Sequence, residues 1–318
     1  MGGLFGAVLA RALDVWWDEL GRPDPFVVVE AAAGTGTLAR SILDAAPRCA
    51  PALRYVLVER SEALREQQAG VVPLEPPPWV LGPTETEDDE LVGVPATGPL
   101  FCSLSELPAQ PVIGVVFANE LLDNLPPLLL AFANGRWCEV RVGEDGGRFV
   151  EVLVPASPEL AEEAARLVPD PHDGARIPIQ HRCREWLRSA LAAVARGRVV
   201  VVDYADTTAA MVGRDFLRTY RAHGRGGDPL EAPGSQDVTC DVAVDQLRPS
   251  PTFDRTQAEF LKAHGIDDLV DAAKAAWQER AHLGDLEALR HRSRANEAPA
   301  LLDPAGLGAF RVLEWRVP

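Results

Sequence analysis

The sequence predicts an α/β fold built on an open, mainly parallel β-sheet with helices on both faces. Two observations lead to this prediction. Short runs of β-branched and other apolar residues recur along the chain, and segments with apolar residues at helical spacing lie between them. The runs are apolar throughout, as in strands that are covered on both faces. No internal repeat or long linker interrupts the chain, so we expect a single domain over residues 1–318.

The first 120 residues supply the expected elements of this sheet in order. Apolar residues at helical spacing predict helices over 4–20, 37–46 and 61–70. The buried strands expected beside them cover 26–30, 54–59 and 112–120. The stretch 71–99 is rich in Pro, Gly and acidic residues, so we expect a surface excursion there.

Two insertions are expected in the rest of the chain. The dipeptide Asn134-Gly135 between apolar runs is a strong turn signal, so we expect a β-hairpin insertion over 127–155 with a third strand at 148–155. The second insertion is expected over 206–300 and mostly helical, with an irregular, polar first part. The other expected elements are a helical segment over 158–196, a fourth buried strand at 198–205, helices at 256–264 and 267–294, and a closing strand at 310–317.

The overall charge limits the partners of the protein. The sequence has 47 acidic and 31 basic residues and a formal net charge of −16, which repels phosphate backbones and argues against nucleic-acid binding. A cationic substrate or a basic protein segment fits this charge better, although acidity also serves solubility alone. The five scattered cysteines lack metal-ligand spacing, and no apolar run is long enough to span a membrane. We therefore expect a cytoplasmic protein without a metal site and without membrane association.

The segment FVVVE-AAAGTG, from Phe26 to Gly36, is the most informative local motif. It joins an expected strand to an expected helix. Gly34 and Gly36 allow backbone angles that side chains forbid, and they let a ligand approach the main chain. Nucleotide-like ligands bind at this edge of open α/β sheets. A tight turn with a purely structural purpose is the alternative.

Two acidic residues help to choose between cofactors. Glu59 ends the second expected strand, where an acidic group can accept hydrogen bonds from ribose hydroxyls. The letters GTGTLA also fit a dinucleotide pattern, so a nicotinamide-dependent oxidoreductase stays an alternative. Glu30, however, ends the first strand, as is typical of turns that bind S-adenosylmethionine (SAM), where the acid supports the loop or the amino-acid end of the cofactor. SAM is therefore favoured.

The polar loop NELLDNLP follows the third expected strand, where the transferable methyl group of SAM is expected. Its carboxylates, Glu120 and Asp123, could align a cationic nucleophile such as an arginine guanidinium. Positioning and electrostatics dominate such an in-line displacement. The alternative is a solvated loop in which Asp123 or Asn124 caps a turn.

Three motifs together resemble one protein family. VVVEAAAGTGTLARSIL, YVLVERSEALREQQ and VVFANELLDNLP are similar to the motifs of the MidA-like SAM-dependent methyltransferases, which include a mitochondrial complex I assembly arginine methyltransferase. The segments VVVVDYA and LRTYRAHGRGGDPLEAPGSQDVTCDV strengthen this resemblance, which extends from about Leu4 to Val317. It implies a class I (Rossmann-like) SAM-dependent methyltransferase sheet with a β-hairpin insertion and a helical insertion. It also implies a protein substrate, with arginine as the acceptor in the mitochondrial branch.

The resemblance assigns roles to residues of this sequence. The residues that it implies for SAM binding are Glu30, Ala32, Gly34, Gly36, Glu59 and Ser103. The residues that it places beside the reaction centre are Asn119, Glu120 and Asp123. On the substrate side it places Asp203, Tyr204, Arg218, Tyr220, His223, Asp228 and Asp237.

The sequence departs from the family pattern in three places. Ala32 and Ala205 stand where the family has glycine, and at Ala32 we expect weakened SAM binding. The family has a further segment, with a Tyr/Gly-rich stretch, before the helix at Leu4; this segment helps to cover the active site. These departures motivate an alternative function, that of a catalytically weak assembly or binding protein that keeps the fold.

Overall fold

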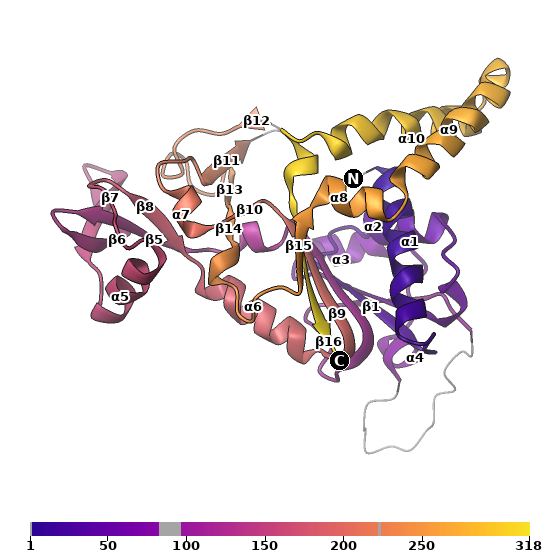
Figure 1. Ribbon diagram of the computed structural model, residues 1–318, viewed down its shortest axis with the longest axis horizontal. Coiled ribbons are helices and arrows are strands. Elements are labelled where there is room, and N and C mark those ends of the chain that lie inside the picture. Colours follow the sequence, from indigo (N-terminus) through magenta and orange to yellow (C-terminus); the bar gives the residue numbers. More distant parts are fainter. Residues whose placement is uncertain (1, 83–96, 222–223) are drawn as a thin grey trace. The chain divides into compact units, whose positions relative to one another are not determined.

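The structure is a computed structural model that describes residues 2–82, 97–221 and 224–318 (Figure 1). The chain forms two compact units, each described by itself. The first, here called the sheet unit, comprises Met1–Asn119, Ser189–Val202 and Thr252–Pro318. The second, here called the insertion unit, comprises Glu120–Arg188 and Asp203–Pro251. The expected single-domain organisation stays a prediction.

A seven-stranded sheet of order β15-β16-β9-β4-β1-β2-β3 is the centre of the sheet unit. Its strands are β1 (Phe26–Ala31), β2 (Leu53–Val58), β3 (Leu100–Leu104), β4 (Val112–Asn119), β9 (Val194–Asp203), β15 (Phe253–Thr256) and β16 (Arg311–Val317). The pairs β1–β2, β2–β3, β1–β4 and β4–β9 are parallel, and β15–β16 is antiparallel. Every residue of β1 and β2 is buried, which explains their apolar runs. The predicted mainly parallel α/β sheet is confirmed.

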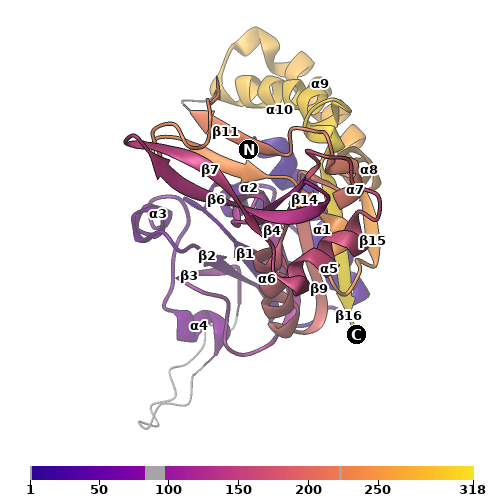
Figure 2. The same cartoon turned by 90° about the vertical axis from the view of Figure 1, so that its left-hand side faces the viewer.

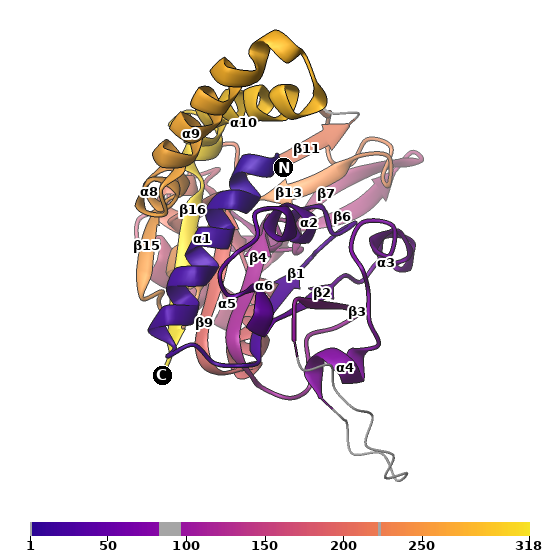
Figure 3. The ribbon, with the colours of Figure 1, turned by 90° about the vertical axis from the view of Figure 1, so that its right-hand side faces the viewer.

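Helices pack around this sheet. They are α1 (Gly3–Glu19), α2 (Thr37–Asp44), α3 (Glu62–Gln68), α4 (Pro77–Leu81), α8 (Gln257–Ala263), α9 (Ile266–Arg280) and α10 (Leu286–Leu302), with short 3₁₀ turns at η1 (Ala50–Ala52), η4 (Ala281–Leu283) and η5 (Leu307–Ala309). Helix α1 packs against α2 on one face of the sheet (Figure 3). The side chain of Trp16 contacts the rings of Phe260 and His264, which fixes α1 to α8.

Two expected elements of the sheet unit differ in the structure. The helix expected over 267–294 is two helices, because Gly284 adopts a left-handed φ of 58° and Asp285 starts a new helix by accepting a hydrogen bond from Ala288 N. The surface excursion expected over 71–99 contains α4, and strand β3, which was not expected, follows it. The strand expected over 112–120 as the third of the chain is therefore the fourth, β4. Residues 83–96 of that excursion lie outside the described residues.

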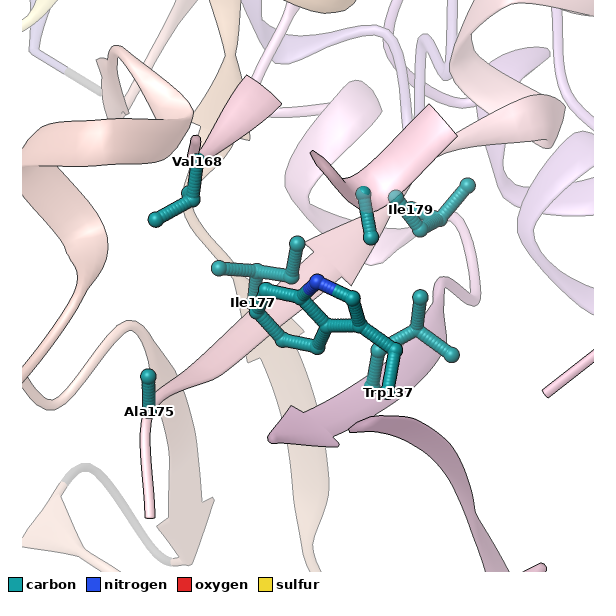
Figure 4. Packing of buried hydrophobic residues seen from close by; sticks show 7 residues of the cluster. Trp137, Val168, Ala175, Ile177 and Ile179 are labelled. Carbon is teal, nitrogen blue, oxygen red and sulfur yellow. The ribbon is translucent and has the colours of Figure 1, made fainter. Parts of the chain in front are cut away.

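The insertion unit contains an antiparallel sheet of order β7-β6-β5-β8. Its strands are β5 (Leu128–Ala133), β6 (Arg136–Asp145), β7 (Arg148–Pro155) and β8 (Arg176–Ile179). The hairpin turn expected at Asn134-Gly135 is confirmed, with φ of 53° and 74°. The expected third strand is β7, which pairs with β6 along its whole length. Trp137, Ile177 and Ile179 pack into a core with Leu130 on one face of the sheet, beneath helix α5 (Pro158–Leu167) (Figure 4).

The remaining elements of the insertion unit are short. They are η2 (Leu122–Asn124), β10 (Ala205–Asp206), α7 (Thr208–Met211), β11 (Leu217–Arg221), β12 (Gly224–Arg225), β13 (Asp237–Cys240), β14 (Val242–Ala243) and η3 (Val244–Gln246). Helix α6 (His181–Ala192) begins in the insertion unit and ends in the sheet unit. The region 206–300 was expected to be mostly helical, but its first part forms strands, and its long helices begin only at Gln257. The segment 158–196 also contains β8 and the start of β9. Strand β8 and strands β10 to β14 have two to five residues, too few to show a period in the sequence.

A buried cluster of charges joins β16 to β9. Glu314 is 1% exposed and pairs with Arg198 of β9 and with Arg255 of β15. Arg198 also pairs with Glu19 at the end of α1. The alternation of 310–317 correctly predicts a strand but does not reveal that its glutamate points inward.

We predict that Glu314→Ala lowers the free energy of unfolding by about 3–5 kcal/mol, because it leaves the Arg198 guanidinium buried with its main partner removed. Urea denaturation measures this loss. The matched control is Glu162→Ala, which removes an exposed ion pair with Arg166 and should change stability little. Equal effects of the two substitutions would contradict the prediction.

Candidate active site

The strand order of the sheet unit reverses between β1 and β4. From β1 the chain proceeds outward to β2 and β3, and then returns to the other side of β1 as β4. Ala31 and Ala118 lie opposite each other where these two parallel strands end. Open α/β sheets bind ligands in the crevice outside the carboxyl ends of the strands at such a reversal. The turn from Ala32 to Gly36 begins at this point.

The backbone of this turn leaves room for a ligand. Gly34 has a φ of 54°, and a Cβ atom built there would meet no atom within 4 Å. Gly36 has a φ of 84° and precedes α2; a Cβ atom there would lie 2.9 Å from Leu57 Cδ2. Ala32 also has a positive φ, of 56°, which is costly for a residue with a side chain. The geometry explains why glycine suits the turn, and it fits a cofactor that lies against the main chain at Gly34.

Side chains from three elements hold Gly34. Its N–H donates to Glu59 Oε2 at 3.0 Å, and its carbonyl accepts from Gln68 Nε2 at 2.8 Å. Ser103 Oγ donates to Gln68 Oε1 at 2.5 Å, and Ser61 N donates to Glu59 Oε1 at 2.9 Å. The structure therefore brings Gly34, Glu59 and Ser103, which the sequence assigns to the cofactor, into one hydrogen-bonded network.

Gln68 is a member of this network that sequence reasoning missed. It is fully buried at the end of α3, although glutamine is mostly exposed in proteins. The only signal in the sequence is a polar residue at the end of a short helix, which does not distinguish it from its neighbour Gln67.

Glu30 lies within β1, just before the turn. It is 5% exposed, and Tyr55 Oη donates to its Oε2 at 2.7 Å. Burial raises the pKa of Glu30 to about 7, against the opposing effect of the hydrogen bond from Tyr55. This contact joins β1 to β2, and the two roles that the sequence leaves open for Glu30 both stay predictions.

The acidic loop after β4 belongs to the insertion unit from Glu120 onward. Glu120 has a φ of 51°, a left-handed conformation that is uncommon for residues with a side chain. The buried carboxylate of Asp203 holds the next turn, because its Oδ2 accepts from Leu122 N at 2.8 Å and from Asp123 N at 3.3 Å. Asp203 was expected on the substrate side; its contacts make it a residue that positions the loop.

Asp123 has the electrostatics of a proton acceptor. Its side chain is 5% exposed and accepts from Asn124 Nδ2 at 2.8 Å. Burial, with the nearby charge of Glu120, raises the pKa of Asp123 to about 6. Burial, with the charge of Asp123, also raises the pKa of Asp203 well above its ordinary value. At neutral pH such a carboxyl group can both take up and release a proton.

Four other residues expected on the substrate side lie on or next to the short strands of the insertion unit. The Arg218 guanidinium lies 5.0 Å from the centre of the Tyr204 ring and pairs with Asp241. Tyr220 on β11 lies opposite Asp237 on β13.

Asp228 is exposed in the following loop, where its Oδ1 accepts from Leu230 N. His223 lies outside the described residues. Within the described ranges, no group of three or more His, Cys, Asp or Glu side chains could hold a metal ion, and no helix has the length and apolar character to cross a membrane.

The fold and this turn fit a class I methyltransferase, and comparison with known proteins assigns the family. A family profile described as "Putative S-adenosyl-L-methionine-dependent methyltransferase" matches residues 8–264. The chain belongs to this family, and its cofactor is SAM. The resemblance to MidA-like methyltransferases is confirmed.

Three relatives are similar to the chain. The Drosophila melanogaster protein named "Protein arginine methyltransferase NDUFAF7 homolog, mitochondrial" is 27% identical over 259 residues, which are 77% of this chain. The match spans 57% of the length of that relative. A Burkholderia thailandensis protein crystallised with S-adenosyl-homocysteine is 26% identical with a TM-score of 0.78, over 100% of this chain and 77% of that one. A native crystal structure from the same bacterium is 27% identical with a TM-score of 0.77, over 99% and 79%.

We predict that Glu30→Gln removes a pH dependence of stability. The pKa of Glu30 in the folded protein lies above its ordinary value of 4.5, so its contribution is fully present below pH 4.5 and is lost as the pH rises through about 7. The stability of the unsubstituted protein relative to Glu30→Gln should therefore fall by roughly 3 kcal/mol between about pH 4 and 8. Denaturation at several pH values measures this difference. The exposed Glu66→Gln is the control, and a difference that does not vary with pH would contradict the prediction.

We predict that Ala32→Gly increases both stability and SAM affinity. Glycine relieves the left-handed strain at φ 56°, which costs an alanine roughly 1–2 kcal/mol, while the greater freedom of the unfolded chain offsets part of the gain. Thermal unfolding and calorimetric titration with SAM measure the two effects. Ala63→Gly in α3 is the matched control and should lower stability by about 1 kcal/mol. A loss of stability for Ala32→Gly as large as that of the control would refute this account.

Proposed function

We propose that this protein transfers the methyl group of SAM to a protein side chain, with arginine as the acceptor. The observation that carries the proposal is the acidic loop that directly follows β4, in which Glu120 is conformationally strained and Asp123 is buried with a raised pKa. The printed name of the Drosophila relative, a protein arginine methyltransferase, supports the choice of acceptor.

We assign roles to the residues of each unit separately. Bound SAM supplies an electrophilic methyl group on a sulfonium. In the sheet unit, the main chain at Gly34 and the carboxylate of Glu59 bind and orient the cofactor, and Glu59 is the group suited to ribose hydroxyls. In the insertion unit, the carboxylates of Glu120 and Asp123 attract and align the guanidinium of the substrate.

Asp123 also accounts for the proton. Nitrogen attacks as a lone pair, so the guanidinium must lose one proton as the new C–N bond forms and the C–S bond breaks. A carboxylate whose pKa is raised to about 6 is a better acceptor for this proton than an ordinary exposed aspartate. Asp203 acts through the main chain, because its hydrogen bonds to Leu122 N and Asp123 N fix the loop that carries the acceptor group.

The net charge of the protein indicates which class of partner it binds. A net charge of −16 favours a basic protein segment and opposes nucleic acid. The cytoplasmic location expected from the sequence stays a prediction, and the Drosophila relative carries a mitochondrial designation.

We predict that the protein labels protein bands when it is incubated with radiolabelled SAM and a cell lysate, and that mass spectrometry of those bands finds methylarginine. Asp123→Asn should lower the labelling rate at least about tenfold without changing SAM affinity. The rate of the unsubstituted protein should rise with pH through about 6, as Asp123 loses its proton. Asp170→Asn, at an exposed residue outside the candidate site, is the control for a change of charge alone.

Two other outcomes have distinct meanings. Label found only in small molecules would contradict a protein acceptor. SAM binding without any labelling, together with a stable protein complex that survives Glu120→Ala, would instead support the assembly or binding protein that the departure at Ala32 motivates.

A further inference from the structure

The hairpin of the insertion unit exposes apolar side chains on one face. Phe149 and Leu153 lie on the same face of β7 because side chains alternate along a strand, and Val142 of β6 lies opposite Glu151 on that face. Phe149 is 53% exposed, Leu153 47% and Val142 62%. We call these three residues and the strand β7 the hairpin surface; Figure 2 shows β6 and β7.

Two adjoining cavities of the insertion unit open on the same face of β7. One has a volume of about 430 Å³ and includes Glu151 and Leu129 in its lining; the other has about 660 Å³ and includes Phe149 and Glu231. Asp228 lines both cavities, so they are neighbours. The exposed apolar side chains therefore border a hollow large enough to receive side chains of a partner.

The backbone of β7 indicates the kind of partner. In the sheet order β7-β6-β5-β8, β7 is an edge strand of eight residues. One of its edges pairs with β6, and the described strands include no second partner for it. Long apolar edge strands are usually shielded, because their main-chain N–H and C=O groups pair with any extended chain. Only an extended polypeptide matches the spacing of those groups.

The charges around the two cavities favour a basic segment. Their acidic residues are Glu151, Asp215, Asp228 and Glu231. Their basic residues are Arg148, Arg176 and Arg214. Arg176 pairs with Glu151, Asp215 pairs with Arg225, and Arg214 pairs with Asp206 outside the cavities, so these charges already have partners. The second cavity keeps two exposed carboxylates, Asp228 and Glu231, in its lining beside Phe149, against the single guanidinium of Arg148.

From this geometry we infer that the hairpin surface docks an extended, basic segment of the acceptor protein, which adds to β7 as a further strand and places an apolar side chain beside Phe149. The inference rests on the proposed function for the identity of the partner. It assigns the choice of protein to the hairpin surface, whereas the acidic loop at Glu120 selects the side chain that is methylated. The hairpin surface would then contribute to KM and not to the chemical step.

The experiment uses the full chain and a fluorescent synthetic peptide of alternating Val and Thr residues, with lysines at both ends and a central arginine. A second peptide of the same charge carries proline at alternate positions, which removes the N–H donors that strand pairing needs. Fluorescence anisotropy should show saturable binding of the first peptide and binding at least about tenfold weaker for the second. Phe149→Ser and Glu231→Lys should each weaken binding of the first peptide about tenfold.

Val238→Ser is the matched control, because Val238 is also an exposed apolar residue of a short strand, β13. Circular dichroism confirms that each variant is folded. Equal affinity for the two peptides, no saturable binding, or unchanged binding in Phe149→Ser would overturn the inference. Concentration-dependent dimers that Phe149→Ser abolishes would overturn it in favour of a second copy of this chain.

The two proposals fail separately. If lysate proteins are labelled with SAM but the labelling rate and the peptide affinity do not depend on Phe149, the docking surface is wrong and the methyltransferase function stands. If peptide binding behaves as expected but no protein is labelled, the surface stands and the proposed acceptor is wrong.

Discussion

The cofactor end of the sheet depends on how Gly34 is held. Its N–H and carbonyl are each bonded to a side chain from a different element, Glu59 after β2 and Gln68 in α3, and Ser103 of β3 completes the link. The turn after β1 is thus tied to the next two strands of the sheet at the position where the strand order reverses. A turn fixed in this way can present its main chain to a ligand without a further loss of conformational entropy on binding. The network also explains a feature that a motif alone does not, namely why a polar, fully buried Gln68 lies in this part of the sheet unit.

The sequence predicts the elements whose environment is uniform. Strands β1 and β2 are buried throughout, and β4 and β9 are buried over most of their length, so their β-branched runs are visible in the sequence. Asn134-Gly135 identifies its hairpin because that turn requires two positive φ angles. Short strands are different. In β8 a proline interrupts the pattern, and it is tolerated because β8 is an edge strand, which becomes known only from the sheet order. Strands β11 to β14 have two to five residues and take their stability from pairing across the chain rather than from local pattern.

The candidate site shows the same limit. Glu30 lies near the end of β1, and Gly34 and Glu59 follow β1 and β2, so their positions at the edge of the sheet can be inferred from the sequence. The function of Asp203 cannot be inferred in this way, because its role depends on which main-chain N–H groups lie beside it after folding. The same is true of Glu314, whose burial is set by Arg198 on a distant part of the chain. A charged residue in a strand gives no sign in the sequence of whether its partner is water or a buried guanidinium.

Calorimetric titration of SAM into the purified protein and into Glu59→Ala tests the central claim, that the turn held by Glu59 is the cofactor site. The account predicts saturable binding of one SAM per chain and a loss of at least about tenfold in affinity for Glu59→Ala, because the substitution removes both the support of Gly34 N and the acceptor suited to ribose hydroxyls. Circular dichroism and thermal unfolding verify that the variant is folded. No binding by the unsubstituted protein, or equal affinity in the folded variant, would contradict the account.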